Sequence, residues 1–355
     1  MIFSPLSRRL PVICAVFGCV ILGAACGNGD PEPRIAPAEA SPTKSAAATA
    51  EVELDDRLLA DLPIGDQPDW IAAGLGSVWV GRDEAAAVDR IDPATNEVVA
   101  TIDVGTHPCN GLVVGFGSVW VPSCEEQALY RIDPVRGKVA AVIDLPVFRS
   151  TAGSLTHELA TGAGAVWMVT QGKKGAFDAL ARINPRTNEV VSTISIGHEG
   201  TGVAVGEDAV WVAAPDDDLV VRVDPRTERV VAKVDGIPAP NFLVFEGGGV
   251  WALSGLRSDR TSGDGGVARI DPATNEVVAR VEIDERGGQA GDLVAGMGAV
   301  WARTQFTLLA KIDPTTNEIA ERVVDQKGLG GISTGFGSVW IADFAFNRVW
   351  RLAPQ

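Results

Sequence analysis

Seven tryptophans, each preceded by valine, recur 39 to 50 residues apart and constrain the fold of this chain more than any other feature. Each is followed by a basic–apolar–x–proline tetrad, such as Arg131-Ile-Asp-Pro134 after Trp120. A period of about 40 residues that is built from short strands is typical of a β-propeller. We therefore predict an all-β protein, a seven-bladed β-propeller, with one of these residues in each blade: Trp79, Trp120, Trp167, Trp211, Trp251, Trp301 and Trp340.

Each unit is predicted to form a four-stranded blade. In the second unit we expect strands at residues 110–115, 117–121, 128–133 and 138–145, because valine-rich segments alternate there with turn residues. A Gly-x-Gly turn between the first two strands permits tight reversal, since glycine has no Cβ. The turn Asp92-Pro-Ala-Thr-Asn96, between the last two strands of the first unit, begins with an aspartate that accepts hydrogen bonds from the residues ahead. Its proline presets φ, and its asparagine tolerates a left-handed backbone.

The ring is predicted to close through the N-terminal strand. Residues 51–65 match the segments that end other units, such as 96–105, whereas the last unit stops at residue 354 without such a segment. An open array of blades would leave unpaired sheet edges. The first strand is therefore expected to complete the last blade.

Residues 1–25 are predicted to be an export signal. Arg8 and Arg9 precede an apolar stretch over residues 10–25. At 16 residues, this stretch is shorter than the roughly 20 residues needed to span a bilayer. It therefore predicts a cleaved signal peptide rather than a membrane-spanning helix.

The end of this signal predicts a lipid anchor. The sequence Leu22-Gly-Ala-Ala-Cys26 resembles a bacterial lipobox, in which the cysteine is lipidated after cleavage. The alternative is an ordinary signal peptide cut near Ala25, with Cys26 incidental. Residues 26–50 are rich in Ala, Pro and Ser and are expected to be a disordered tether, followed by the propeller at 51–355. We predict a protein anchored by lipid to the extracytoplasmic side of the cell membrane.

Charge and cysteine content agree with this location. The chain carries 46 acidic against 30 basic residues, a formal net charge of −16, which disfavours binding to nucleic acid or to anionic lipid surfaces. We expect a monomer. Beyond Cys26, the remaining cysteines are Cys109 and Cys124, which the strand order places on the same face of one blade. In an oxidising compartment we expect them to form a disulfide.

The repeated residues themselves are predicted to be structural. One large flat side chain per blade fills the wedge between adjacent sheets, so the seven tryptophans are expected in the core rather than in a ligand site. The basic residue of each tetrad is expected to cap its strand, with its aliphatic stem packed down.

The repeat is broken on one face of the disc. Strand direction alternates, so the first-to-second and third-to-fourth turns share one face, and the other connections share the opposite face. On that second face, the path from tryptophan to the tetrad lengthens to 15 residues at Trp167–Arg182 and to 18 at Trp251–Arg269. Function is expected where a rigid repeat varies. The candidate ligand-binding residues there are Asn110, His157, Glu158, His198, Asn241, Arg257, Asp292 and Asp343.

No established catalytic or metal-binding spacing is present among these candidates. The pairs His157-Glu158 and His198-Glu199 suggest metal ligands, but adjacent residues of a strand point to opposite faces and do not converge on one ion. The sequence contains no Ser-His-Asp order, nucleotide-binding loop or paired-cysteine metal motif. We therefore predict no metal site and no cofactor.

The unit GxGSVWV…RIDPxTNEVVATIxVG resembles the YVTN-type and streptogramin-lyase-like seven-bladed propellers over residues 51–354. Lyases of that group open a cyclic depsipeptide by elimination, with a histidine base and a magnesium ion held by carboxylates near the central channel. The slot of that histidine is filled by histidine here only at His157, and the slot of the acidic residue, three after each tryptophan, is acidic only at Asp343. These two are the catalytic candidates that the resemblance implies, and they lie several blades apart in sequence order.

Two functional hypotheses follow. The first is a lipid-anchored propeller that binds a small ligand or a protein partner through its varied face and is not an enzyme. The alternative is a divergent, magnesium-dependent lyase that acts on a cyclic peptide or a polysaccharide. A binder needs only an exposed, chemically mixed loop surface, whereas a lyase needs a base and metal ligands that converge, so the sequence favours the first.

Overall fold

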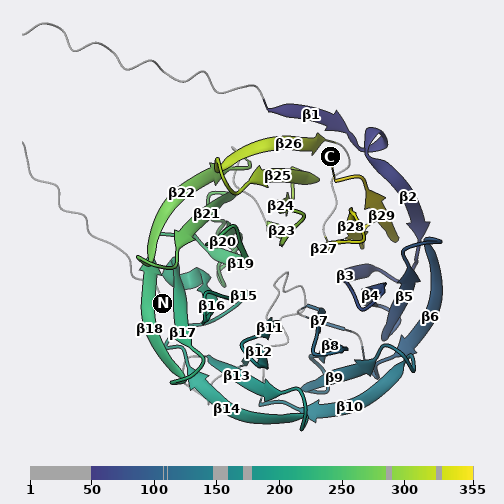
Figure 1. Ribbon diagram of the computed structural model, residues 1–355, viewed down its shortest axis with the longest axis horizontal. Helices are drawn as coiled ribbons and strands as arrows, with labels where there is room; N and C mark the ends of the chain where they lie inside the picture. Colours follow the sequence, from purple (N-terminus) through teal and green to yellow (C-terminus); the bar gives the residue numbers. More distant parts are fainter. Residues whose placement is uncertain are drawn as a thin grey trace, which may run out of the picture. The chain divides into compact units, whose positions relative to one another are not determined.

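Each valine–tryptophan unit forms one blade of a ring in the computed structural model (Figure 1). The structure describes residues 49–106, 108–109, 111–146, 159–170, 178–284, 290–324 and 330–354. Seven sheets surround a central axis, which confirms the predicted seven-bladed all-β propeller. In this part of the chain the helical elements are two 3-10 turns, η1 (Leu54–Asp56) and η2 (Pro215–Asp217). No helix within the described ranges is long and apolar enough to cross a membrane.

Four antiparallel strands build each blade and are named a to d from the channel outward. Each set of strands is given in order from blade 1 to blade 7. The a strands are β3 (Pro68–Gly74), β7 (Val113–Gly115), β11 (Leu159–Gly162), β15 (Val203–Gly206), β19 (Pro240–Glu246), β23 (Ala290–Gly296) and β27 (Ile332–Gly335). The b strands are β4 (Ser77–Arg82), β8 (Ser118–Ser123), β12 (Ala165–Thr170), β16 (Ala209–Ala214), β20 (Gly249–Ser254), β24 (Ala299–Thr304) and β28 (Ser338–Asp343). The c strands are β5 (Ala87–Asp92), β9 (Ala128–Asp133), β13 (Ala179–Asn184), β17 (Leu219–Asp224), β21 (Gly266–Asp271), β25 (Leu309–Asp313) and β29 (Arg348–Leu352). The d strands are β6 (Glu97–Asp103), β10 (Lys138–Asp144), β14 (Glu189–Ser195), β18 (Arg229–Asp235), β22 (Glu276–Glu282), β26 (Glu318–Val324) and β2 (Leu58–Pro63).

The strands expected in the second unit are found with small shifts. The predicted strand 128–133 coincides with β9, and 138–145 corresponds to β10. The innermost strand is shorter than predicted, because β7 begins at Val113 rather than at residue 110. The chain already touches its partner at the isolated bridge between Pro108 and Ser123. It then leaves the ladder at Gly111, where φ is +116°, and resumes pairing at Val113.

The turns between strands c and d have the expected chemistry. Asp92 Oδ1 accepts a hydrogen bond from the Ala94 amide at 2.8 Å, and the Asn96 amide donates to the Asp92 carbonyl at 2.8 Å. Asn96 adopts a φ of +60°, a left-handed conformation that asparagine tolerates. The left-handed asparagine recurs in three other blades at Asn188, Asn275 and Asn317.

The N-terminal segment closes the ring, as predicted, but in two pieces. Strand β2 pairs antiparallel with β29 and so supplies the outer strand of blade 7. Strand β1 (Ala50–Glu53) instead pairs in parallel with β26 and adds a fifth strand to blade 6. Between them, Arg57 Nη2 forms an ion pair with Glu321 Oε2 at 2.5 Å. The single closing strand expected over 51–65 is therefore corrected to two strands that hold the outer edges of two neighbouring blades.

The seven repeated tryptophans form the core, as predicted. Each is at most 2 % exposed. Trp167 packs with residues of the next blade such as Val203 and Val212, so the apolar core lies between adjacent sheets. Each indole N–H donates to the carbonyl of the residue five positions earlier, as from Trp79 to Gly74 at 3.1 Å. The polar edge of every tryptophan is thus satisfied inside the wall between blades.

The basic residue of each tetrad joins one blade to the next. The Arg222 guanidinium lies over the Trp211 ring, 5.0 Å from its centroid, within blade 4. Its Nη1 donates to the Pro272 carbonyl at 2.5 Å and to Asn275 Oδ1 at 2.8 Å, both in the c–d turn of blade 5. The same basic-residue-to-next-turn contact recurs around the ring, donated by Arg90, Arg131, Arg182, Arg269, Lys311 and Arg351. The expected structural role is confirmed, and its partner is the neighbouring blade rather than the residue's own strand.

Candidate functional site

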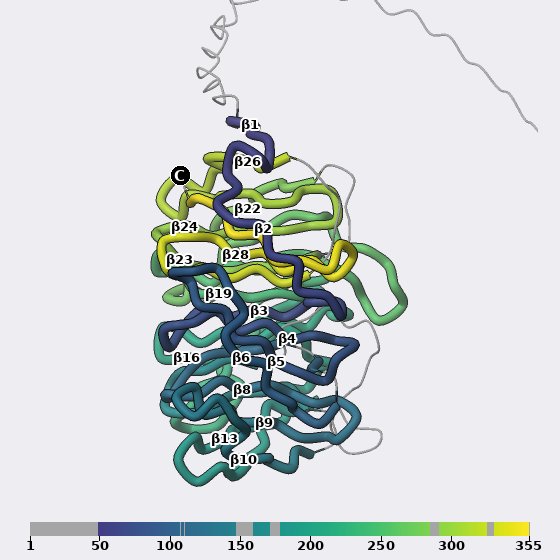
Figure 2. The backbone as a smooth tube through the Cα atoms, turned by 90° about the vertical axis from the view of Figure 1, so that its right-hand side faces the viewer, coloured from purple at the N-terminus to yellow at the C-terminus, as the bar shows by residue number. Residues whose placement is uncertain are grey.

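The two faces of the disc differ, as the sequence indicates. We call the face that carries the b–c and d–a connections, such as 255–265, the loop-rich face. We call the opposite face, which carries the a–b and c–d turns, such as 75–76 and 93–96, the short-turn face. Figure 2 shows the loop-rich face on the right, where the green b–c loop of blade 5 projects beyond the disc. Two clusters of charged side chains lie on the loop-rich face.

The first cluster centres on a buried ion pair between blades 6 and 7. Arg303 in β24 approaches Asp343 at the end of β28, with Nη2 and Oδ2 2.5 Å apart and neither side chain exposed. Arg303 Nη1 also donates to the Ala342 carbonyl at 2.7 Å and to the Gly330 carbonyl at 3.4 Å. Asp343 Oδ1 accepts from the Phe346 amide at 3.1 Å. The guanidinium therefore crosses from one blade to the next, and the carboxylate fixes the loop that follows it.

Asp292 in β23 belongs to the same cluster and is fully buried. Its Oδ1 accepts from the Leu293 amide and its Oδ2 from the Ile332 amide of blade 7, both at 2.7 Å. Burial raises the pKa of Asp292 to about 8, even though the two amides and Arg303 favour the charged form. The carboxyl group therefore retains a proton near neutral pH.

Asp69 in β3 completes the cluster from blade 1 and is only partly buried. Its backbone carbonyl accepts from the Gly331 amide at 2.8 Å. Desolvation, together with the nearby Asp83 and Asp292 carboxyl groups, raises the pKa of Asp69 to about 7, against the opposing effect of Arg303. Asp69 is thus a desolvated carboxyl group whose pKa lies near physiological pH.

The second cluster is an acidic turn that three blades share. The turn η2 and the residue after it present Asp216, Asp217 and Asp218 from the b–c loop of blade 4. His198, which precedes blade 4, places Nδ1 2.7 Å from Asp217 Oδ2. Arg257 of blade 5 places Nη2 2.6 Å from Asp218 Oδ1. The Ser258 amide donates to Asp216 Oδ1 at 2.7 Å, so the base of the long blade 5 loop is tied to blade 4.

The predicted ligand-binding residues fall into these two clusters, lie outside the described ranges or, for Asn241, stand apart from both clusters. Asp292 and Asp343 join the first cluster, and His198 and Arg257 join the second. Asn241 in β19 is 6 % exposed, and its buried Oδ1 has no hydrogen-bond partner among the described residues. The predicted residues outside the described ranges are Asn110, His157 and Glu158.

Sequence reasoning missed the residue that organises the first cluster. Arg303 stands two positions after its tryptophan, inside a b strand. A single charge at an otherwise small or apolar repeat position was a signal that could have identified it. The corresponding residues of the other blades are Gly81, Pro122, Val169, Ala213, Leu253 and Ala342. The acidic run Asp216–Asp218 was a second unused signal.

No three His, Cys, Asp or Glu side chains within the described ranges are placed to hold a metal ion. In the first cluster, Arg303 donates to one carboxylate and opposes the raised pKa of two other carboxyl groups. Such a cluster can accept or release a proton near neutral pH, or hydrogen-bond a polar ligand at Asp69.

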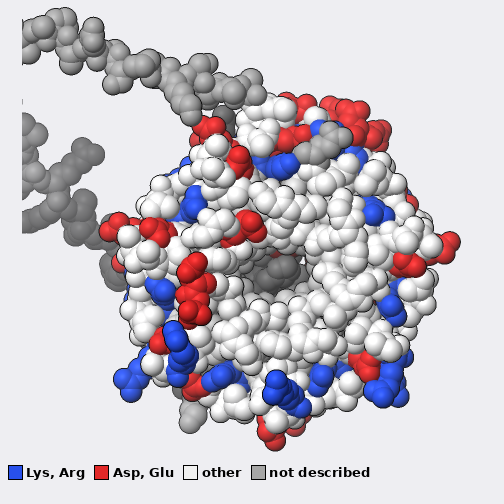
Figure 3. Space-filling view, in the orientation of Figure 1, with Lys and Arg blue, Asp and Glu red and all other residues white. Residues whose placement is uncertain are grey.

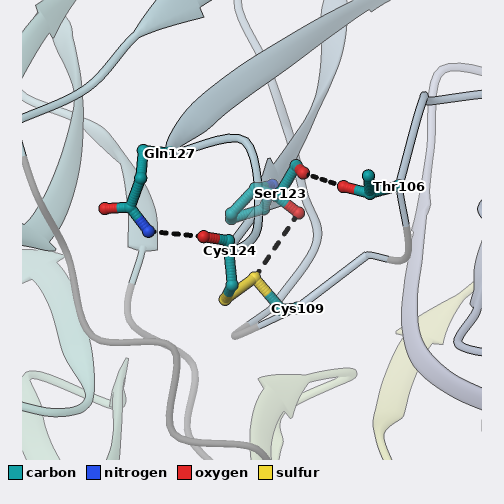
Figure 4. The surroundings of a disulfide bond; sticks show 6 residues. Thr106, Cys109, Ser123, Cys124 and Gln127 are labelled. Carbon is teal, nitrogen blue, oxygen red and sulfur yellow. Dashed lines mark hydrogen bonds between the residues drawn. A yellow bond between two sulfur atoms is a disulfide. The ribbon is translucent and has the colours of Figure 1, made fainter.

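The predicted disulfide is present on the loop-rich face of blade 2 (Figure 4). Cys109 precedes β7 and Cys124 follows β8, with their Cα atoms 5.9 Å apart. Gln127 donates to the Cys124 carbonyl, and the hydroxyl groups of Thr106 and Ser123 are hydrogen-bonded beside it. The bond therefore fastens the d–a connection before blade 2 to the b–c connection within it.

No protein-family model matches the chain, and no curated protein sequence matches it. Among solved structures, it is similar to a streptogramin B lyase, with a TM-score of 0.65, 17% sequence identity, and coverage of 83% of this chain and 96% of the lyase. It is also similar to virginiamycin B lyase from Staphylococcus aureus, with a TM-score of 0.67, 16% identity, and coverage of 83% and 99%. Hydrazine synthase from Kuenenia stuttgartiensis gives a TM-score of 0.66 at 14% identity, with coverage of 85% and 97%. At these identities the likeness concerns the fold, and the chain has a streptogramin-lyase-like seven-bladed propeller fold.

Proposed function

We propose that the protein is a binding module that captures a small ligand or a protein partner on its loop-rich face. The observation that carries the proposal is the construction of the blade 5 loop. Residues 259–262 at its tip are exposed and chemically mixed, whereas Arg257 and Ser258 at its base are bonded to the acidic turn of blade 4. A loop held in one conformation before binding loses less entropy when a partner docks. Such an exposed tip on an anchored base suits recognition.

The expected location extends this proposal. A lipid on Cys26 and a tether over residues 26–50 would hold the propeller on the extracytoplasmic side of the membrane as a monomer. From there the loop-rich face would meet extracellular ligands or membrane-bound partners. We propose no cofactor for this role.

The test is site-specific photocrosslinking in the cell. A photoreactive residue is placed at Arg260 in the loop tip, and a control at Ala273 in the exposed c–d turn of the same blade, on the short-turn face. We expect a discrete adduct from position 260 and none from position 273. Replacing residues 255–264 by a short turn should abolish that adduct and leave the thermal unfolding of the ring intact. Equal adducts from both positions, or an adduct retained without the loop, would contradict the proposal.

A divergent lyase is the second candidate, and one observation favours it. Asp69 occupies in blade 1 the slot that His157 occupies in blade 3, is partly exposed, and has a pKa of about 7. A carboxyl group with that pKa can act as a general base at neutral pH. The test is magnesium-dependent opening of a cyclic depsipeptide, with Asp69→Asn and His157→Ala as variants. A rate that neither substitution lowers, or no turnover at all, would end this candidate.

A further inference from the structure

The short-turn face, from which the sequence predicts no function, contains a cavity of about 630 Å³ at the junction of blades 2 and 3. Its walls include Phe116, Arg131, Ala165, Arg182, Arg186 and Val191, and none of the described residues that line it is acidic. Figure 3 shows this face, where Lys and Arg side chains gather toward its lower edge. Three guanidinium groups around one cavity are a marked local exception in a chain whose formal net charge is −16.

The cavity exists because the contact between neighbouring blades is incomplete there. Arg222 reaches both the proline carbonyl and the asparagine of the next turn. Arg131 reaches Asn188 Oδ1 at 2.9 Å but makes no hydrogen bond to the Pro185 carbonyl among the described residues. A single hydrogen bond therefore joins Arg131 of blade 2 to the c–d turn of blade 3, and space remains beside that turn.

Arg182 makes fewer hydrogen bonds than Arg131, the equivalent arginine of blade 2. In blade 2, Arg131 Nε donates to Ser118 Oγ at 2.8 Å. In blade 3, Ala165 stands where Ser118 stands in blade 2, so Arg182 lacks the serine partner that Arg131 has. Its Nη1 donates to Glu228 Oε1 at 2.8 Å, the one hydrogen bond of this guanidinium to a described residue. Nε and Nη2 therefore remain available to a ligand.

Arg186 and the apolar walls complete the site. Arg186 is exposed at the tip of the blade 3 turn, and its guanidinium forms no ion pair with any described residue. Phe116 is 44 % exposed and holds a left-handed φ of +52°, which a bulky side chain rarely adopts. Val191 is 50 % exposed on the other side. Three guanidiniums offset by one carboxylate, Glu228, leave a surplus of two positive charges, which matches a doubly charged anion.

We propose that this cavity binds an organic phosphate: the phosphate group between Arg131, Arg182 and Arg186, and an apolar body against Phe116 and Val191. Guanidinium groups recognise phosphate oxygens through paired hydrogen bonds. The cavity volume lies in the range of small-molecule sites, about 300 to 1,000 Å³. The site is independent of the function proposed for the loop-rich face, since it lies on the opposite face of the disc.

The test is calorimetric titration of the full chain carrying Cys26→Ser, so that the protein is free of membrane, with phenyl phosphate and with inorganic phosphate. We expect phenyl phosphate to bind at least tenfold more tightly than inorganic phosphate. Arg186→Gln should weaken phenyl phosphate at least fivefold, because it removes an exposed guanidinium that the fold does not use. Ala165→Ser, which restores the hydroxyl group beside Arg182, should also weaken binding.

The control is Arg136→Gln, which removes another exposed arginine, ion-paired with Asp133, from the turn of blade 2 outside the cavity. It should change the affinity less than twofold. Co-sedimentation with phosphatidylcholine vesicles, with and without phosphatidic acid, separates the two sources of a phosphate group. Binding to the acidic vesicles that Arg186→Gln abolishes would assign the site to a lipid headgroup. No binding in any arm, or equal weakening by Arg136→Gln and Arg186→Gln, would overturn the proposal.

Discussion

Arg303 of blade 6 and Asp343 of blade 7 form an ion pair of 2.5 Å in which neither side chain is exposed to solvent. A buried charge that loses its partner is strongly destabilising, whereas the loss of both charges costs less. The chain itself offers the replacements, since leucine and serine stand at these two repeat positions in blade 5 as Leu253 and Ser254.

We predict that Arg303→Leu lowers the free energy of unfolding by about 3–5 kcal/mol. Asp343→Ser should lower the free energy of unfolding by less than Arg303→Leu does, because Asp69 and Asp292 can ionise beside the remaining guanidinium. The double variant should lose clearly less free energy of unfolding than the sum of the losses in the two single variants. Urea unfolding of the four proteins measures this, and additive losses would show that the pair is not coupled.

The buried carboxyl groups predict a loss of stability as pH rises. The folded-state pKa values of Asp69 and Asp292 are about 7 and 8, above the ordinary value of about 3.9 for an unfolded aspartate. The folded protein therefore holds protons that the unfolded chain has lost. This contribution is complete below about pH 4 and disappears as pH rises through the folded-state values.

We therefore expect the free energy of unfolding to fall between pH 5 and pH 8, by up to about 1.4 kcal/mol per pH unit for the proton on Asp292. Asp292→Asn should be less stable at pH 5, because it replaces one acceptor oxygen by a donor. Its stability should, however, fall less steeply with pH. Urea unfolding at several pH values measures this. If the free energy of unfolding falls with pH equally steeply in Asp292→Asn and in the native protein, the proton is not on Asp292.

The contact between adjacent blades predicts a large difference between two arginines of blade 4. Arg222→Ala removes the hydrogen bonds to Pro272 and Asn275 and the stacking on Trp211, so we expect a loss of about 2–3 kcal/mol. Arg226→Ala removes an exposed arginine of the following turn and should cost under about 0.5 kcal/mol. The midpoint of thermal unfolding distinguishes them. Equal shifts would mean that the bridge between blades adds nothing to stability.

The disulfide predicts a moderate and local stabilisation. Cys109 and Cys124 are 15 residues apart, a loop length for which the closed bond contributes about 3 kcal/mol. The variant with both cysteines changed to alanine should lose about that amount. Intact mass should rise by two hydrogens when the native protein is reduced. A protein whose mass does not respond to reduction and alkylation would lack the bond.

The proposed lipid anchor predicts a change of compartment rather than of stability. Cys26→Ser should move the protein from the membrane fraction to the soluble extracytoplasmic fraction, because the anchor is lost while the propeller is untouched. Ser41→Cys is a control that keeps a thiol in the tether at another position. In a Cys26→Ser background it should not restore membrane association. Cell fractionation with immunodetection measures both, and a Cys26→Ser protein that stays with the membrane would refute the anchor.

The fold was predictable from the sequence because the repeat places the same chemistry in every blade. The valine–tryptophan pair specifies a core strand, and the turn Asp92–Asn96 has the same form in four units. The match of residues 51–65 to the segments that close other units predicted that this segment completes a blade, and β2 does so in blade 7. These are local patterns, and each recurs often enough to be recognised without knowledge of tertiary contacts.

The candidate site was less predictable because it depends on how blades meet. That Arg303 lies beside Asp343, about 40 residues away, follows from the rotation between neighbouring blades, which no local pattern encodes. The partner of Arg222 in the next turn was missed for the same reason. The sequence did mark Arg303 as a departure from the repeat, because no other blade has a charged residue at that position. What it could not supply was the side chain that each departure faces.

The pairing of β2 with β29 links the order of synthesis to the completion of folding. Strand β2 is made early, yet its partner is the last strand of the chain, so blade 7 cannot be finished until residue 352 is available. A chain that is interrupted before β29 keeps an unpaired strand and an open ring edge. Such an edge invites aggregation or proteolysis. Two segments almost 290 residues apart in sequence must therefore meet before the outer edge of blade 7 is paired.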